Sequence, residues 1–221
     1  MADLGAIEFL WDGTANVWAS DHWGREGVFP KWPGEVNGTD TYTNDPVALG
    51  SAAGVFPTGG PAASTTVAWL YIGAEIVADY VIPATVTSCG RVTNEVLGKI
   101  VTVTCNCTGN LADEIGSSVT GGYRVKAGLT IDGFISAGGL IALERGVSVL
   151  GEQPVTSYGI QCGSAGVVLG DNCTVAYGIG GSGGDAPLTV GTGCSVAATG
   201  GDVAATSLVT PAKAEPTPLV I

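Results

Sequence analysis

Histidine is almost missing from this chain of 221 residues, and only 13% of the residues are charged. The one histidine is His22, so a Ser-His-Asp triad would have to use it, and no serine lies in a nucleophile-elbow context. The phosphate-binding pattern GxxxxGK followed by Ser or Thr is absent. Asp113 and Glu114 are adjacent acids, but neighbours on a strand point to opposite faces, so we expect them in a turn. The sequence therefore predicts a protein that is not an enzyme.

Basic residues are also few, since eight Lys and Arg stand against 20 Asp and Glu, for a net charge of −12. Proteins that bind nucleic acid need a basic face, so direct contact with nucleic acid is not expected. No stretch approaches the roughly 18 apolar residues of a membrane span. The first residues, Met-Ala-Asp-Leu, lack the basic and apolar regions of a signal peptide. We expect a protein that is made in a cytoplasm and does not enter a membrane.

Cysteines are too few for a disulfide scaffold of this size. The sequence has six of them, at positions 89, 105, 107, 162, 173 and 194. None forms a CxxC pair, and Cys105-Asn106-Cys107 is not a zinc signature, so we predict no metal site, no cofactor and buried free thiols. Cys173 and Cys194 stand at equivalent places in a repeat and are expected to stack. A ladder of thiols is the preferred interpretation, and a disulfide between adjacent layers is the alternative.

Glycine, by contrast, is abundant, with 36 residues, and short runs of Val, Ile, Ala and Leu are interrupted by Gly, Thr, Ser and Asn. This mixture is typical of an all-β protein with many tight turns. Four segments in the second half share a small residue or Pro followed by three strand-forming residues. They are Gly128–Ile131, Gly146–Val149, Gly166–Leu169 and Pro187–Val190, at spacings of 18, 20 and 21 residues. Two longer matches support the repeat: Gly170–Ala176 with Gly191–Ala197, and Tyr158–Ile160 with Tyr177–Ile179.

Units of about 20 residues cannot bury an apolar face alone, so they gain stability by stacking on one another. The sequence therefore predicts a β-solenoid, that is, a parallel β-helix. Four residues are expected in neighbouring layers of one column: Leu129, Val147, Val167 and Leu188.

The chain divides by composition into four parts. Residues 1–64 are an irregular Trp-rich docking or anchor segment, and residues 65–120 are a β-rich connecting region. Residues 121–207 are the solenoid rungs, and residues 208–221 are an extended C-terminal arm, because the prolines there cannot continue a ladder. Within the connecting region, segments 84–89 and 99–105 are strand-like and form either irregular first rungs or a preceding sheet.

Aromatic residues are concentrated near the N-terminus, where four of the five tryptophans occur. One interpretation is that these rings close the end of the solenoid or fill a small local core. The other is a docking surface for a partner, because aromatic residues gather at the centres of interfaces; carbohydrate stacking is a third. The candidate docking residues are Trp11, Trp18, Trp23, Trp32 and Phe29.

The stretch Leu169-Gly-Asp-Asn-Cys-Thr followed by Val175-Ala-Tyr-Gly-Ile-Gly, and its repeat from Val190, resemble the hexapeptide repeat of left-handed β-helix acyltransferases. The resemblance covers residues 169–201. Those enzymes, and the hexapeptide carbonic anhydrases, use histidine in the helical region, and this chain has none after His22. The repeat is similar, but the chemistry is not supported.

The whole chain is also similar in composition to small, acidic, Gly/Thr/Val-rich β proteins of bacteriophage particles, although no motif defines that class. The resemblance implies a structural virion protein that is assembled in the host cytoplasm, with a head decoration or minor capsid role. Its expected partners are the major capsid protein or other virion proteins and further copies of itself, with a trimer favoured. The alternatives are a tail fibre or receptor-binding piece, and a carbohydrate-active β-helix enzyme.

Overall fold

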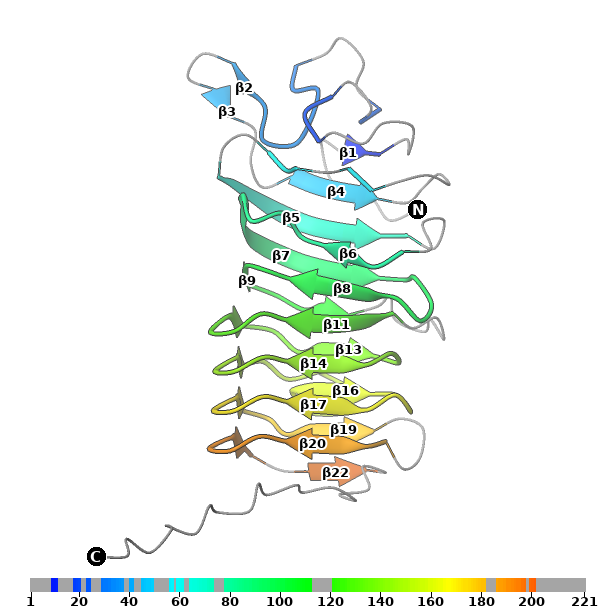
Figure 1. Ribbon diagram of the computed structural model, residues 1–221, viewed down its shortest axis with the longest axis vertical. Helices are drawn as coiled ribbons and strands as arrows, with labels where there is room; N and C mark the ends of the chain where they lie inside the picture. The colour runs from blue at the N-terminus through cyan, green and yellow to red at the C-terminus, as the bar shows by residue number, and fades with distance from the viewer. Residues whose placement is uncertain are drawn as a thin grey trace, which may run out of the picture.

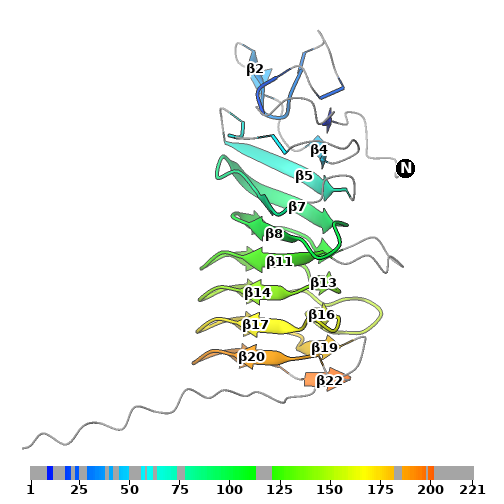
Figure 2. The same cartoon turned by 45° about the vertical axis from the view of Figure 1, so that its right-hand side comes forward.

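The structure is a computed structural model, and its described part consists of strands, turns and bends without helices. The described residues are 9–11, 18–20, 23–24, 29–37, 40–41, 45–49, 56–57, 59–61, 64–73, 78–112, 121–181, 186–197 and 199–201. Parallel strands stack as a β-solenoid of about six turns, which confirms the predicted fold class. Figures 1 and 2 show the column, with the N-terminal strands at the top and β22 at the bottom.

Each complete rung contributes one strand to each of three faces. Face 1 contains β6 (Tyr80–Val81), β8 (Ile100–Val103), β11 (Gly122–Val125), β14 (Ile141–Leu143), β17 (Val167–Leu169) and β20 (Leu188–Val190). Face 2 contains β9 (Asn106–Cys107), β12 (Thr130–Ile131), β15 (Ser148–Val149), β18 (Thr174–Val175) and β21 (Ser195–Val196). Face 3 contains β10 (Leu111–Ala112), β13 (Ile135–Ala137), β16 (Ile160–Cys162), β19 (Ile179–Gly181) and β22 (Thr199–Gly201).

The long strand β7 (Val86–Asn94) joins faces 2 and 3, because its first half pairs with β9 and its second half with β10. Above it, β5 (Thr65–Ile72), β4 (Asp45–Leu49) and β1 (Phe9–Leu10) extend the same parallel sheet toward the N-terminus. Among the described strands, only β2 (Val36–Asn37) and β3 (Asp40–Thr41) pair antiparallel. The parallel ladder is therefore not confined to residues 121–207, and segments 84–89 and 99–105 belong to its first rungs rather than to a separate sheet.

Inward-facing side chains form continuous rows, because alternate residues of every short strand point into the column. On face 1 the row is Tyr80, Val101, Tyr123, Ile141, Val167 and Leu188. On face 2 it is Cys89, Cys107, Ile131, Val149, Val175 and Val196. On face 3 it begins Val92, Leu111, Ile135, Ile160 and Ile179. All of these except Val196 are buried, so the rows form one hydrophobic core.

The corner between faces 1 and 2 requires the left-handed backbone conformation in four successive rungs. Gly128, Gly146, Asn172 and Gly193 occupy this place, with φ of 73°, 72°, 57° and 70°. Glycine has no Cβ to strain there, and asparagine tolerates the conformation better than most residues. This corner explains why glycine recurs just before the strands of face 2.

The first corner after β7 is held instead by the buried side chain of Asn94. Its amide nitrogen donates to the carbonyl oxygens of Lys99 (3.1 Å) and Gly122 (2.9 Å), and its side-chain oxygen accepts from the Val96 N–H (3.1 Å). The Asn94 N–H itself donates to the Tyr123 hydroxyl at 3.0 Å. The Asn94 side chain thus hydrogen-bonds three backbone groups, two in the turn between β7 and β8 and one in β11.

The repeat aligned from the sequence is confirmed as a stack, but its register is only partly right. Val167 pairs with Leu188 on face 1, whereas Leu129 and Val147 directly precede the paired residues Thr130 and Ser148 of face 2. The four residues lie in neighbouring layers of one column, as predicted, although on two different faces. The error arises because similar segments introduce both faces, and because the rung between Ile141 and its partner Val167 is 26 residues long.

The two longer matches have the register that the sequence indicated. Thr174 pairs with Ser195, so Cys173 and Cys194 precede equivalent positions, and both are free cysteines. Ile160 pairs with Ile179, in agreement with the repeated Tyr-Gly-Ile. The predicted C-terminal arm, residues 208–221, lies outside the described residues.

Candidate functional surfaces

Three of the candidate docking tryptophans lie inside the molecule. Trp11, Trp18 and Trp23 are at most 1% exposed. The ring centroid of Trp23 lies 4.8 Å from that of Trp11 and 4.9 Å from that of Trp18, and Phe9 meets Trp23 edge-on at 6.5 Å. These four residues form a small aromatic core, as one of the interpretations of the sequence expected.

Hydrogen bonds fix the aromatic core to the chain around it. The Trp18 indole N–H donates to the Pro33 carbonyl at 2.9 Å, and the Trp23 indole N–H donates to the Trp18 carbonyl at 2.7 Å. The Trp11 backbone N–H donates to the carbonyl of Ala48 in β4 at 3.0 Å. The core therefore lies against the N-terminal end of the column, and the three buried rings offer no face to a partner.

Phe29 and Trp32 differ from the other candidates because both are only half-buried. Trp32 packs against the hydrophobic core, and its carbonyl accepts the Glu35 N–H at 3.1 Å, which closes a tight turn. These two rings are the aromatic groups of the predicted docking set that retain exposed surface. The docking role stays a prediction, and it now depends on them.

A second aromatic group, which the sequence analysis missed, lies on the half-exposed outer side of β5 and β7. Trp69 and Arg91 are cross-strand partners, and the guanidinium carbon is 4.9 Å from the indole centroid. The Trp69 indole N–H donates to the Thr93 hydroxyl at 3.0 Å, Tyr71 meets Trp69 edge-on, and the Tyr71 hydroxyl donates to Glu95. We call these five residues the Trp69 ridge. The period-two alternation of residues 65–72 was the signal that could have placed Trp69 and Tyr71 near one another.

Three buried thiols meet at the corner between faces 1 and 2 in the first rungs. The Sγ atoms of Cys105 and Cys89 are 3.7 Å apart, and Cys107 is the cross-strand partner of Cys89. Contact with Cys105 and burial raise the pKa of Cys89, and burial raises the pKa of Cys107 to about 11. Contact with Cys89 lowers the pKa of Cys105. Because the thiolate is the reactive form, the raised pKa values suit Cys89 and Cys107 to packing rather than to nucleophilic chemistry.

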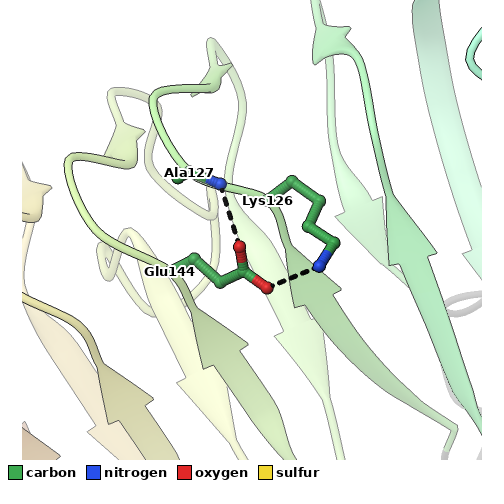
Figure 3. A network of polar contacts seen from close by, with 3 residues as sticks. All are labelled: Lys126, Ala127 and Glu144. Carbon is green, nitrogen blue, oxygen red and sulfur yellow. Dashed lines mark hydrogen bonds and ion pairs between the residues drawn. The ribbon is translucent and has the colours of Figure 1, made fainter.

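A charged contact links two rungs at the outer corner between β11 and β14 (Figure 3). Lys126 Nζ lies 2.8 Å from Glu144 Oε1, and the other carboxylate oxygen of Glu144 accepts the Ala127 N–H at 3.3 Å. These bonds hold the pKa of Glu144 below its ordinary value. The same corner carries a similar contact between the next two rungs, after β17 and β20. There Asp171 Oδ1 accepts both the N–H and the hydroxyl of Thr192, and these bonds lower the pKa of Asp171. Polar contacts at this corner therefore join successive rungs from outside.

The outer side of face 2 carries a single file of short polar side chains. Its members are Ser88, Asn106, Thr130, Ser148, Thr174 and Ser195, one from each rung. Neighbouring strands are about 4.8 Å apart, so the file repeats at that interval. The outer side of face 2 is therefore polar along this line.

The described residues contain no group of three His, Cys, Asp or Glu side chains that would hold a metal ion. Within the same part of the chain, no helix has the length and apolar character that crossing a membrane requires. His22, Asp113 and Glu114, the residues on which catalysis was considered, lie outside the described residues.

Comparison with protein-family models, with curated proteins and with solved structures gives no match to this chain. The resemblances to hexapeptide-repeat enzymes and to phage proteins therefore stay predictions.

Proposed function

We propose that the protein is a structural component of a virus particle, acting as a head decoration or minor capsid protein of a bacteriophage. The observation that carries the proposal is the continuous core: inward side chains are buried in every rung from Tyr80 to Val175. Closely packed interiors resist deformation, so the two ends and three faces keep fixed relative positions. Such a column suits a spacer or cement that joins neighbouring subunits.

The outer surface is consistent with assembly. A net charge of −12 keeps the free chain soluble and favours docking on a basic partner surface. The polar row of face 2 offers hydroxyl groups, and the amide of Asn106, at a regular interval. The proposed partners are the major capsid protein, other virion proteins and further copies of this chain, without direct contact with nucleic acid.

Phe29 and Trp32 are the proposed anchor to the particle. Both rings are half-buried, so each keeps a partly exposed apolar surface beside the closed end of the column. A partly exposed aromatic side chain that becomes buried on docking is the kind of residue that dominates interface energetics. The anchor is therefore expected at the N-terminal end, and the column is expected to extend away from it.

The test is the location of this chain in particles purified from a lysate in which its gene is expressed. We expect the protein to sediment with the particles in a density gradient at a fixed copy number per particle. Trp32→Ala should lower particle binding at least tenfold, whereas Trp69→Ala, which changes the outer side of β5, should leave it unchanged. A chain that stays at the top of the gradient, with unchanged circular dichroism, would refute the proposal.

The Trp69 ridge favours a second candidate, a fibre or receptor-binding piece. A half-exposed indole with a guanidinium on one side and a phenol at its edge can contact a sugar ring or an exposed peptide. In that case Trp69→Ala should abolish adsorption to host cells, and Trp32→Ala should not. The same pair of variants thus separates the two functions.

A further inference from the structure

The C-terminal end of the column differs from the rungs above it. The strands β20, β21 and β22 lie last in their sheets, so within the described residues each is paired on one side only. A parallel strand that ends a sheet presents a row of backbone N–H and C=O groups to any further strand. Here three such rows lie at one level, one on each face. We call β20, β21 and β22 the terminal rung.

The interior of the terminal rung is also incompletely covered. In the rung above, Leu169, Cys173 and Val175 are at most 2% exposed. Their counterparts Val190, Cys194 and Val196 pack against the core but are only partly buried. Apolar side chains are therefore exposed at this end because no further rung of the described chain lies on them.

The strands of the terminal rung carry no charged side chain. Residues 186–201 contain no Asp, Glu, Lys, Arg or His, and the acidic residue shown in contact with this rung is Asp171 of the rung above, which bonds Thr192. Proteins commonly protect open strand edges with lysine, inward-pointing charges or proline. Among these devices the strands β20, β21 and β22 have only Pro187, which precedes β20. No like charges on the three facing strands therefore oppose their pairing with a second copy.

The other end of the column is covered by the aromatic core. Phe9, Trp11, Trp18 and Trp23 are buried, and the Trp11 N–H is hydrogen-bonded to β4. Within the described residues, β1 and β6 are also paired on one side only, but they lie at different levels of the column. A head-to-tail contact would therefore not pair three strands at one level, whereas the contact of two C-terminal ends, a two-fold arrangement, does so.

We infer that two copies of this chain pair end to end through their terminal rungs. A two-fold axis perpendicular to the column reverses the direction of the strands, so the facing strands pair antiparallel and continue the sheets. Val190, Cys194 and Val196 of both copies then become core residues. The contact does not depend on the proposed function, and it has two-fold rather than three-fold symmetry.

The test measures the mass of the full chain by sedimentation over a range of concentrations. We expect twice the chain mass of 22.0 kDa. Val196→Lys places a charge in the interior of the terminal rung and should weaken dimerisation at least tenfold. Thr189→Lys is the matched control, because Thr189 is exposed on the outer side of β20 in the same rung, and it should leave the dimer intact.

A second measurement uses the unaltered chain, so that its result does not depend on whether a variant folds. Cys194 is partly exposed in the terminal rung, so its alkylation by iodoacetamide should slow as the protein concentration rises into the range of the dimer. A monomer at every concentration would overturn the inference and would mean that another segment or a different protein covers this end. A trimer whose mass is unchanged by Val196→Lys would overturn it as well.

Discussion

Two buried tyrosines in the same interior row of face 1 differ in whether their hydroxyl groups are hydrogen-bonded. The Tyr123 hydroxyl accepts the Asn94 N–H at 3.0 Å and donates to the Val92 carbonyl at 3.3 Å. The Tyr80 hydroxyl, two rungs above, is buried and has no partner in the described part of the chain. Replacing each tyrosine by phenylalanine should therefore change stability in opposite directions.

The magnitudes follow from the cost of burying polar groups. Tyr80→Phe removes an unsatisfied hydroxyl, and we expect the free energy of unfolding to rise by about 1 kcal/mol. Tyr123→Phe leaves the Asn94 N–H and the Val92 carbonyl without this partner, and we expect a loss of about 2 kcal/mol. For a chain of this size each kcal/mol shifts the Tm by about 2–4 °C. The two variants should therefore differ in Tm by about 6–12 °C.

The assay is thermal and urea unfolding of both variants and the parent chain, followed by circular dichroism. A dependence on pH gives a second check, because burial and the nearby Cys89 raise the pKa of Tyr80 above its ordinary value of 10.0. A group whose pKa is raised on folding contributes stability below its unfolded pKa and loses it as the pH rises. The parent chain should therefore lose stability above about pH 10 relative to Tyr80→Phe.

The reasoning fails if Tyr80→Phe destabilises the protein by as much as Tyr123→Phe does. That result would mean that the hydroxyl of Tyr80 has a partner in the folded protein, or that the interior packs differently around β6 and β8. Equal values for both variants at pH 7, with no difference at alkaline pH, would contradict the burial of the Tyr80 hydroxyl without a hydrogen-bond partner.

Three further variants test the corners and the long rung. Asn94→Ala removes three side-chain hydrogen bonds from a buried corner, and we expect a loss of about 3 kcal/mol in urea unfolding. Glu144→Gln should cost about 0.5 kcal/mol at pH 7 because the Lys126 pair is exposed. The pKa of Glu144 is lowered on folding, so its contribution should begin to decrease as the pH falls below the ordinary value of 4.5, and the difference should vanish only below the lowered pKa of the folded protein. Replacing Pro154–Ser157 by Asn-Gly should change the Tm by less than about 3 °C, since the Gln153 N–H already bonds the Tyr158 carbonyl at 2.8 Å.

The stacking could be predicted from the sequence because the column repeats its own local pattern. Val, Ile and Leu at alternate positions indicate strands, and the glycines mark corners that need a left-handed backbone. Cys173 and Cys194 were placed correctly because four of the seven residues in the segments that contain them are identical and a fifth pair is Thr and Ser. A repeat of that length fixes the register even when the rungs differ in size.

The register of the earlier rungs could not be predicted, for a physical reason. The same short pattern introduces face 1 at Val167 and face 2 at Val147, so a single segment does not identify its face. The loop around Val155, a residue that is 88% exposed, lengthens one rung without adding a layer to the column. The inward-facing residues of a rung are buried in the folded chain and the residues of an inserted loop are exposed, and this difference in burial is not visible in the sequence.

The aromatic residues show a second limit of the sequence. A cluster of tryptophans such as Trp11, Trp18 and Trp23 is typical of a docking surface as well as of a core. Only the folded structure shows that these three side chains pack on one another. Trp69 and Arg91 are 22 positions apart, so their contact depends on the pairing of β5 with β7. Side-chain pairs between rungs are set by rung length, which a pattern of local propensities does not contain.

The two proposed contact surfaces lie at opposite ends of a stack in which each rung contacts only its neighbours. Trp32 is near the closed end, and Val196 is about six rungs away, or roughly 30 Å at 4.8 Å per rung. Substitutions this far apart with no shared partners are additive to within about 0.5 kcal/mol. The double variant Trp32→Ala, Val196→Lys should therefore lose particle binding and dimerisation by the same factors as the single variants. A coupling larger than about 1 kcal/mol in either measurement would mean that the column transmits a change between its ends, contrary to independent nearest-neighbour rungs.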